Sequence, residues 1–244
     1  METKEVTGDT PLMLRHPFSG EILFKVISEL GENWTGDVDG EVDHGTTEYQ
    51  AWSDKGWTDI KRVIRSRSRK QIYHVLTDTG YIKVSKDNVM LTNTFYHIKP
   101  AQCDVNTKLL SRYVVEFQNI YNGLDNNHAY MCGVMLGDQE YLVPPPEVIN
   151  GPLEVAENFI TGFTSSNTTD QSDVCLAGLY HLYKKTNKRV KLHLVDGTVT
   201  IVPAAGIQTN KIRLVEPINY MYEYIYSIET EVGRFQAGVG DIII

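Results

Sequence analysis

The sequence predicts a mainly β protein whose β-rich part is interrupted by an inserted α+β region. Between residues 48 and 91, short segments of alternating β-branched, aromatic and polar residues are separated by turn residues, as is typical of strands. The same character returns from residue 212 to the end, whereas helical spacing occurs only in the middle of the chain. We therefore expect one discontinuous β domain, formed by residues 1–99 and 212–244, and an insertion at residues 100–211.

Two turn signals predict β-hairpins. Asp78-Thr79-Gly80 and Asp196-Gly197 each lie between two segments of strand character. Asp-Gly pairs favour tight hairpin turns because both residues tolerate positive φ. Residues 31–45 are rich in Gly, Asp and Glu, and we expect them to form a solvated loop.

Three segments of the insertion have the periodicity of helices. In the first segment, one face carries Ala129, Cys132, Gly133, Leu136 and Gly137. In the second segment, one face carries Ala156, Phe159, Ile160 and Phe163. The third segment covers residues 174–185. Three consecutive prolines at residues 144–146 separate the first two, because proline interrupts a helix.

Composition excludes several classes of protein. The formal net charge is −8, which disfavours non-specific binding of nucleic acid by the molecule as a whole. Cys103, Cys132 and Cys175 are odd in number and widely spaced, which fits neither a disulfide framework nor a zinc site. No apolar stretch approaches the roughly 20 residues that cross a bilayer, and residues 1–5 lack the pattern of a signal peptide. We expect a protein that is neither secreted nor bound to a membrane.

Both ends of the chain carry parts of one known pattern. Val6-Thr7-Gly8-Asp9-Thr10-Pro11 would by itself be an ordinary turn. It occurs together with residues 48–58, residues 72–80 and the C-terminal segment 235–244. Together these segments resemble the blocks of inteins inserted in family B DNA polymerases of viral type. The resemblance covers most of the chain and implies the Hint fold, a horseshoe-shaped, mainly β domain that brings both chain ends into one active site.

The resemblance also assigns roles at the start of the chain. An intein begins with a thiol or hydroxyl nucleophile that attacks the preceding carbonyl and converts an amide into an ester. Glu5 occupies this position, followed in the same block by Thr7, Asp9 and Thr10. A carboxylate is not a competent substitute, so we expect the first acyl shift to fail.

Two further blocks depart from the intein pattern. The second block of inteins has a Thr and, three residues later, a His that protonates the leaving nitrogen. Here Ser85 stands for the Thr and Asn88 for the His, and an amide cannot deliver a proton near neutral pH. Ser227 replaces the acid of a Tyr-Asp-Ile pattern. Inteins end on a His-Asn pair, and this sequence stops at Ile244, where that pair would begin.

These departures predict an intein that does not splice as it stands. Natural decay and deliberate alteration of the sequence both account for them. Splicing implies no cofactor, and the implied partners are the flanking segments of the DNA polymerase. We expect a monomer that is located where the polymerase acts, in the cytoplasm, a viral factory or the nucleus.

Within the insertion, residues 128–138 resemble the first helix of a LAGLIDADG homing endonuclease. In that family two helices pack closely through small residues, a role for Gly133 and Gly137 here. The resemblance assigns to Asp138 the acid that binds a divalent metal, with Mg²⁺ needed for any residual cleavage of DNA.

The second LAGLIDADG helix is matched by residues 156–167. This segment ends in Ser165, Ser166 and Asn167, which supply no carboxylate, and Asp170 is a shifted candidate. A single acid cannot hold the metals for both DNA strands. We therefore expect the endonuclease to be degenerate and impaired.

Two alternatives stay open. The first is a DNA-binding module that recognises double-stranded DNA of the polymerase gene without cutting it. The candidate phosphate contacts are Lys184, Lys185, Lys188, Arg189 and Lys191, together with the basic residues of segment 61–70, although a solvated basic face explains them too. The second is a β-rich interaction protein with chance motif matches, which a wide separation of Glu5 from Ile244 would favour.

Overall fold

Most of the β structure in the described part of the chain lies in one large antiparallel sheet. The computed structural model describes residues 4–37, 41–67, 69–111, 117, 119–121, 123–138, 143–166, 171–206 and 209–244. Within these residues the strands of the sheet are β1 (Val6–Thr7), β2 (Pro11–Arg15), β3 (Ile22–Val26), β4 (Glu32–Gly36), β5 (Val42–Thr46), β6 (Gln50–Ser53), β7 (Gly56–Arg67), β8 (Ile72–Thr77), β9 (Gly80–Ser85), β14 (Ile212–Ile218), β15 (Tyr224–Thr230) and β16 (Val239–Gly240).

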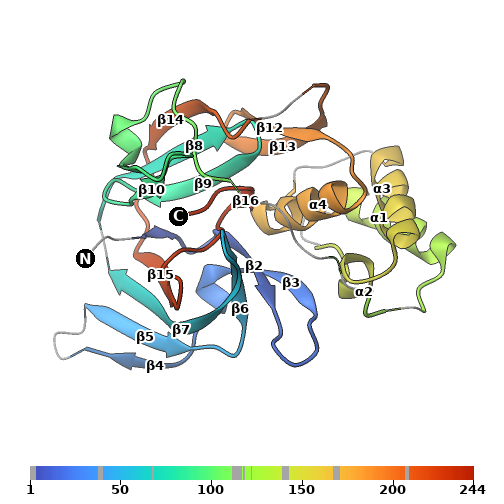
Figure 1. Ribbon diagram of the computed structural model, residues 1–244, viewed down its shortest axis with the longest axis horizontal. Helices are drawn as coiled ribbons and strands as arrows, with labels where there is room; N and C mark the ends of the chain where they lie inside the picture. Colours follow the sequence, from blue (N-terminus) through green and yellow to red (C-terminus); the bar gives the residue numbers. More distant parts are fainter. Residues whose placement is uncertain are drawn as a thin grey trace.

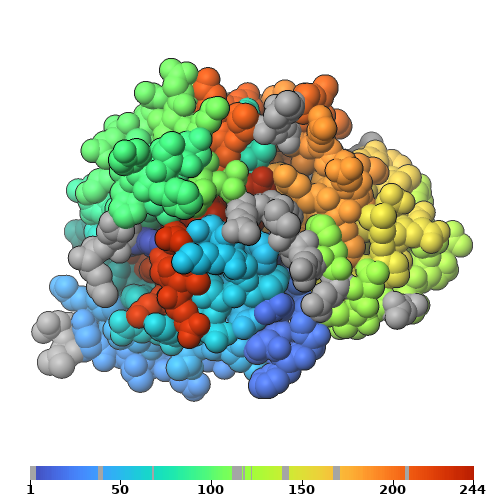
Figure 2. Space-filling view, in the orientation of Figure 1, coloured from blue at the N-terminus to red at the C-terminus, as the bar shows by residue number. Residues whose placement is uncertain are grey.

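The order of the strands joins the two ends of the sequence. The pairing runs β14-β8-β9-β1-β15-β7-β6-β2-β3, with β16 on β9, β5 on β7 and β4 on β5. Strands from residues 212–244 are thus hydrogen-bonded to strands from the first third of the chain. Figure 1 shows the strands curved around the C-terminal segment, and Figure 2 shows segments from the first third and the last part side by side on one face. The predicted mainly β domain, discontinuous in sequence, is confirmed.

Both predicted hairpins are present. The Asp78-Thr79 turn joins β8 to β9, and Asp196-Gly197 joins β12 (Val190–Val195) to β13 (Thr198–Pro203). Asp196 and Gly197 have φ of 50° and 82°, as a tight hairpin turn requires. A shorter hairpin is formed by β10 (Met90–Leu91) and β11 (His97–Ile98).

The prediction of a loop at residues 31–45 is wrong, because β4 and β5 occupy this segment. The reason lies in β7, which is long enough to pair with both β15 and β5. The edge of β7 that does not pair with β15 provides hydrogen-bond partners for the backbone of β5, although the composition of that segment is polar. Local composition does not reveal such a partner.

The three predicted helices are also present. The insertion contains α1 (Asn126–Asp138), α2 (Pro146–Ile149), α3 (Leu153–Ser165) and α4 (Asp173–Lys185). Helices α1 and α3 touch through their backbones, since a Cβ on Gly133 would lie 2.1 Å from the carbonyl oxygen of Phe159 and one on Gly162 would lie 2.0 Å from that of Tyr130. The predicted close approach at Gly133 is therefore observed. None of the helices in the described part of the chain has the length and apolar character needed to cross a bilayer.

The insertion begins later than residue 99 and shares a core with the β domain. Leu109 is buried in the core of the curved sheet, and its amide donates to the carbonyl of Asn210 at 2.9 Å. Ser111 forms a bridge with Ile242, so the chain up to Ser111 packs as part of the β domain. A second core joins helices α1, α3 and α4 to Met13, Trp52, Tyr81 and Val239 of the strands and their flanks.

We expect Gly133→Ala to destabilise the protein by about 2 kcal/mol, because the added methyl group overlaps backbone atoms of α3. The loss should occur although alanine favours a helix over glycine by about 1 kcal/mol. Urea denaturation followed by circular dichroism measures it. Gly123→Ala is the control, since a Cβ there meets nothing within 4 Å. Equal stability of the two variants would contradict the observed backbone contact.

Candidate functional site

The central feature of the site is a row of three residues across neighbouring strands. Strand β1 lies between β9 and β15, and Val6 pairs with one residue of each. Continued by one residue, the same registers place Ser85 and Ser227 on either side of Glu5. The amide of Ser85 donates to the carbonyl of Glu5 at 3.0 Å, as this register requires. Directly opposed residues face the same side of a sheet, so the three side chains share one face.

The carboxylate of Glu5 is engaged by two donors. Lys70 Nζ lies 2.7 Å from Oε1 and 2.9 Å from Oε2, and Ser85 Oγ donates to Oε2 at 2.6 Å. The side chain of Glu5 is only 13% exposed, so water screens this ion pair little. Burial opposes the charge on Lys70, but the hydrogen bond to Glu5 and the charges of Glu5 and Asp87 raise the pKa of Lys70 above its usual value.

Asn88 lies in the turn that follows β9. Its amide donates to the carbonyl of Ser85 at 3.0 Å. The side chain is fully buried, and neither Oδ1 nor Nδ2 has a hydrogen-bond partner within the residues that the structure describes. A buried amide without partners costs stability, so this position carries a local energetic penalty next to Ser85.

The remaining residues of the first block form a turn. Thr10 donates its amide to the carbonyl of Thr7 at 3.0 Å, and their buried hydroxyls are 3.2 Å apart. The side chain of Asp9 is 46% exposed, and although burial opposes its charge, its hydrogen bond with Thr7 contributes to lowering the pKa of Asp9. Thr7 and Thr10 shape the turn, and Asp9 connects it to a second group of charges.

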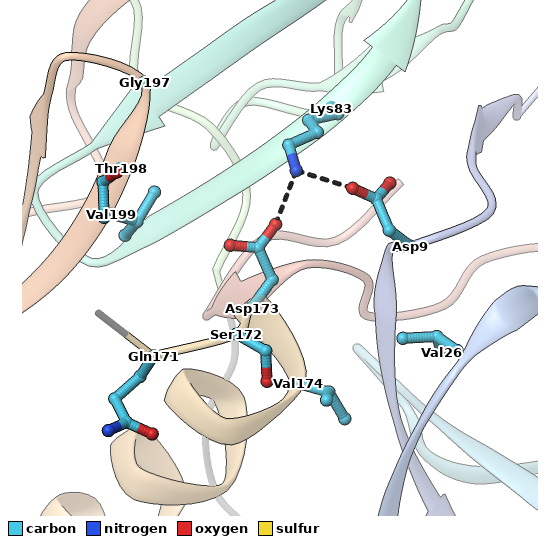
Figure 3. A pocket seen from close by; sticks show the side chains of 10 residues that line it. All are labelled: Asp9, Val26, Lys83, Gln171, Ser172, Asp173, Val174, Gly197, Thr198 and Val199. Atoms are coloured by element: carbon cyan, nitrogen blue, oxygen red, sulfur yellow. Dashed lines mark hydrogen bonds and ion pairs between the residues drawn. The ribbon is translucent and has the colours of Figure 1, made fainter. Parts of the chain in front are cut away.

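That second group is centred on Lys83. Figure 3 shows its ammonium between Asp9 and Asp173, with Nζ 2.7 Å from Asp9 Oδ2 and 2.8 Å from Asp173 Oδ2. Burial disfavours the charged forms, but the ion pairs dominate: they lower the pKa of Asp9 and raise the pKa of Lys83. The group borders a cavity of about 410 Å³ between β strands and the start of α4. Lys83 and Ser85 are two apart on β9 and therefore face the same side.

The start of the chain and its last residue share one core. Val6 and Ile244 belong to the same buried cluster. Ile244 exchanges both backbone hydrogen bonds with Phe235, at 3.0 and 2.9 Å. Lys4 Nζ donates to the carbonyl of Gly233, two residues before Phe235. Short chains of contacts therefore connect Glu5 with Ile244. This argues against the alternative of a β-rich interaction protein whose motif matches arose by chance.

The residues present do not fit a nuclease metal site. Asp138 is exposed at the end of α1, and Ser166 follows the end of α3 beside Gly137. Asn167 and Asp170 lie outside the described residues. Within the described ranges, no three His, Cys, Asp or Glu side chains are grouped so that they could hold a metal ion. Asp138 alone does not make the site for Mg²⁺ that the LAGLIDADG resemblance implies.

Two of the proposed phosphate contacts are used inside the protein. Lys184 Nζ lies 3.2 Å from Asp241 Oδ2. Lys185 is buried and donates to the carbonyls of Ile149 and Gly151, at 2.9 and 2.5 Å, and burial lowers the pKa of Lys185 to about 8. Lys185 is therefore not part of an exposed basic face, whereas Lys184 is half-buried beside Asp241.

Comparisons with known proteins identify the fold. No family model matches the chain. A DNA polymerase of Acanthamoeba polyphaga mimivirus is 37% identical over 350 aligned residues, which include 98% of this chain. The chain spans only about a fifth of the length of that polymerase, 20%. An intein from a hyperthermophile superimposes with a TM-score of 0.50 and 8% identity, and 98% of each chain is covered.

The chain has the fold of inteins. A solution structure of the Pab PolII intein is similar as well, with a TM-score of 0.49, 11% identity, and coverage of 97% of this chain and 98% of that one. At 8% identity the hyperthermophile intein shows the shared fold alone.

Sequence reasoning missed two cations at the face of this intein fold. From the sequence, Lys70 is expected only as one of the basic residues of segment 61–70, and Lys83 is given no role. The period of a strand contained a signal for Lys83, because a residue two positions before Ser85 on β9 faces the same side of the sheet. No local signal identifies Lys70, because its contact with Glu5 joins residues that are 65 positions apart.

We expect Lys70→Met to destabilise the protein by about 2 kcal/mol, because it leaves a largely buried carboxylate with the hydroxyl of Ser85 as its main partner. Thermal and chemical unfolding measure the change. Arg69→Met removes an exposed positive charge one residue away and should change stability little. If Glu5→Gln combined with Lys70→Met restores none of the loss, the ion pair is not its cause.

Proposed function

We propose that this chain is the protein-splicing element of a DNA polymerase and that Glu5 blocks its first chemical step. The observation that carries the proposal is the row of Glu5, Ser85 and Ser227 in an intein fold, with the Glu5 carboxylate bound by Lys70. Homology to a segment of a viral DNA polymerase supports the assignment of the host protein. The flanking polymerase segments are then its partners.

The chemistry at position 5 explains the block. The bond to be cut joins the carbonyl of Lys4 to the nitrogen of Glu5. A thiol at position 5 would form a thioester with that carbonyl as the C–N bond breaks and the nitrogen takes a proton. A carboxylate would instead form an anhydride, which is a more reactive acyl group than the amide, so the amide is retained. The ammonium of Lys70 further lowers the nucleophilicity of the Glu5 carboxylate.

The second part that the proposed splice site lacks is a group that donates a proton to the leaving nitrogen. Asn88 has no acidic proton to give at neutral pH, and Ser85 Oγ is already used as a donor to Glu5. Every group in the proposed chemistry belongs to the chain itself, so splicing needs no cofactor, and a monomer suffices. The same argument predicts that replacing residues 5 and 88 together has a larger effect than replacing either one.

We expect Glu5→Cys combined with Asn88→His to make the Lys4–Glu5 junction cleavable by thiols. The protein carries an affinity tag before Met1, and dithiothreitol intercepts the thioester. Mass spectrometry detects release of the tagged N-terminal segment. Glu5→Ala combined with Asn88→His provides no nucleophile and should stay intact under the same conditions.

The ligation step is then tested by adding Ser227→Asp, a terminal His-Asn pair and a downstream flank. Ligated flanks of the expected mass support a splicing scaffold. Absence of thiol-dependent cleavage in the folded Glu5→Cys, Asn88→His protein would sink the proposal.

A second candidate function is recognition of double-stranded DNA by a degenerate LAGLIDADG region. The close backbone contact of α1 and α3 through Gly133 and Gly162 favours it, because helices in that family pack in this way. The lack of a grouped metal site in the described residues argues that such binding would occur without cleavage.

We expect this second function to produce at least tenfold tighter binding to a duplex of the polymerase-gene insertion site than to a scrambled duplex. Fluorescence anisotropy at 50 and 200 mM salt measures both affinities, and the affinity should fall as salt rises. Lys188→Gln with Lys191→Gln should weaken binding, and Glu157→Gln, also in the insertion, is the control. Equal affinity for both duplexes removes this function.

A further inference from the structure

Helix α4 belongs to the insertion by sequence, but it packs as a part of the β domain. Figure 1 shows α4 between the sheet and the α1–α3 pair. It contacts β2, β3 and β16, and most of its residues are buried around its whole circumference. A helix buried on all sides is a core element, unlike a surface helix with one apolar stripe. Gly178 of α4 faces Phe24 of β3 and Pro144, which confirms how closely it is enclosed.

The first end of α4 is tied to the start of the chain. Asp173, in the first turn, accepts from Lys83 of β9 at 2.8 Å, and the same ammonium donates to Asp9 at 2.7 Å (Figure 3). Asp9 lies in the turn of the first block, immediately after β1. The side chains of Lys83 and Asp173 are 17% and 19% exposed, so solvent screens their interaction little.

The other end of α4 is tied to the C-terminal segment. Lys184, in the last turn, lies 3.2 Å from Asp241, whose side chain is 8% exposed. The amide of Asp241 donates to the carbonyl of Thr79 at 3.0 Å, and Ile242, Ile243 and Ile244 follow directly. One helix therefore pairs directly with the C-terminal segment and is linked through Lys83 of β9 to the turn of the first block, the two segments that the proposed splicing reaction must bring together.

We infer that Asp173 and Lys184 are positioning residues for the splice site, and that α4 holds the first-block turn and the C-terminal segment in place. The inference rests on the proposed splicing function. It separates α4 from α1 and α3, whose main helix contact is with each other. Loss of α4 would release both ends of the splicing element.

A simpler explanation has to be distinguished. An acid in the first turn and a cation in the last turn also stabilise a helix through its dipole. That effect would act on the amides of α4 itself. The positioning role instead predicts an effect on segments 6–10 and 241–244, which are separate from α4 in sequence.

Hydrogen–deuterium exchange of the otherwise unmodified protein tests the positioning role. We expect Asp173→Asn to accelerate exchange in segment 6–10, and Lys184→Met to accelerate exchange in segment 241–244, each about tenfold, as the loss of a shielded charged hydrogen bond predicts. Asp173→Glu should restore slow exchange. Glu157→Gln and Lys188→Met remove exposed charges from the insertion and should change neither segment.

A second measurement connects these segments to the reaction. In the tagged Glu5→Cys, Asn88→His protein, Asp173→Asn should slow thiol-dependent cleavage about tenfold, and Asp173→Glu should restore it. Failure of the parent protein to cleave counts against the splicing function, while the exchange measurement still decides whether α4 holds both segments. Faster exchange in α4 alone, or an unchanged cleavage rate in Asp173→Asn, would overturn the inference.

Discussion

The structure depends on the placement of β1, a strand of only two residues, between β9 and β15. Through this placement, residues near positions 5, 85 and 227 become neighbours across one sheet. Neither β9 nor β15 would be enough by itself to position Glu5, because β9 supplies only Ser85 and β15 only Ser227. The geometry of the candidate site is therefore a property of the whole sheet, and the fold must be largely formed before the site exists.

The same face of the sheet carries two sets of charges. Around Glu5, an ion pair with Lys70 lies in the row across β9, β1 and β15. Around Lys83, an ammonium shared by two aspartates connects β strands to α4. A buried carboxylate whose oxygens accept hydrogen bonds is compatible with a stable fold, whereas the Asn88 side chain, which has no hydrogen-bond partner in the described part of the chain, is a local cost.

The features predicted from the sequence are those with a local physical cause. The hairpin turns at residues 78–80 and 196–197 and the three helices follow from short-range periodicity or turn chemistry, whereas the close approach at Gly133 was predicted from the resemblance of its helix to the LAGLIDADG family. The row through Glu5 was reached by family resemblance, because registers between distant strands leave no local pattern. Lys70, the burial of Lys185, and strands β4 and β5 were missed for a related reason: each depends on a partner that is remote along the chain.

The central position of β1 has a consequence for synthesis of the chain on the ribosome. Its partner β9 emerges early, but β15 becomes available only after residue 230 has been translated. Until then one edge of β1 stays without its strand, and the hydrophobic side chains around Val6 lack part of their cover. Long-range pairings of this kind are formed late and slowly. A nascent chain paused within the insertion would therefore expose an unpaired sheet edge, which is the type of surface that chaperones shield and that aggregates when left uncovered.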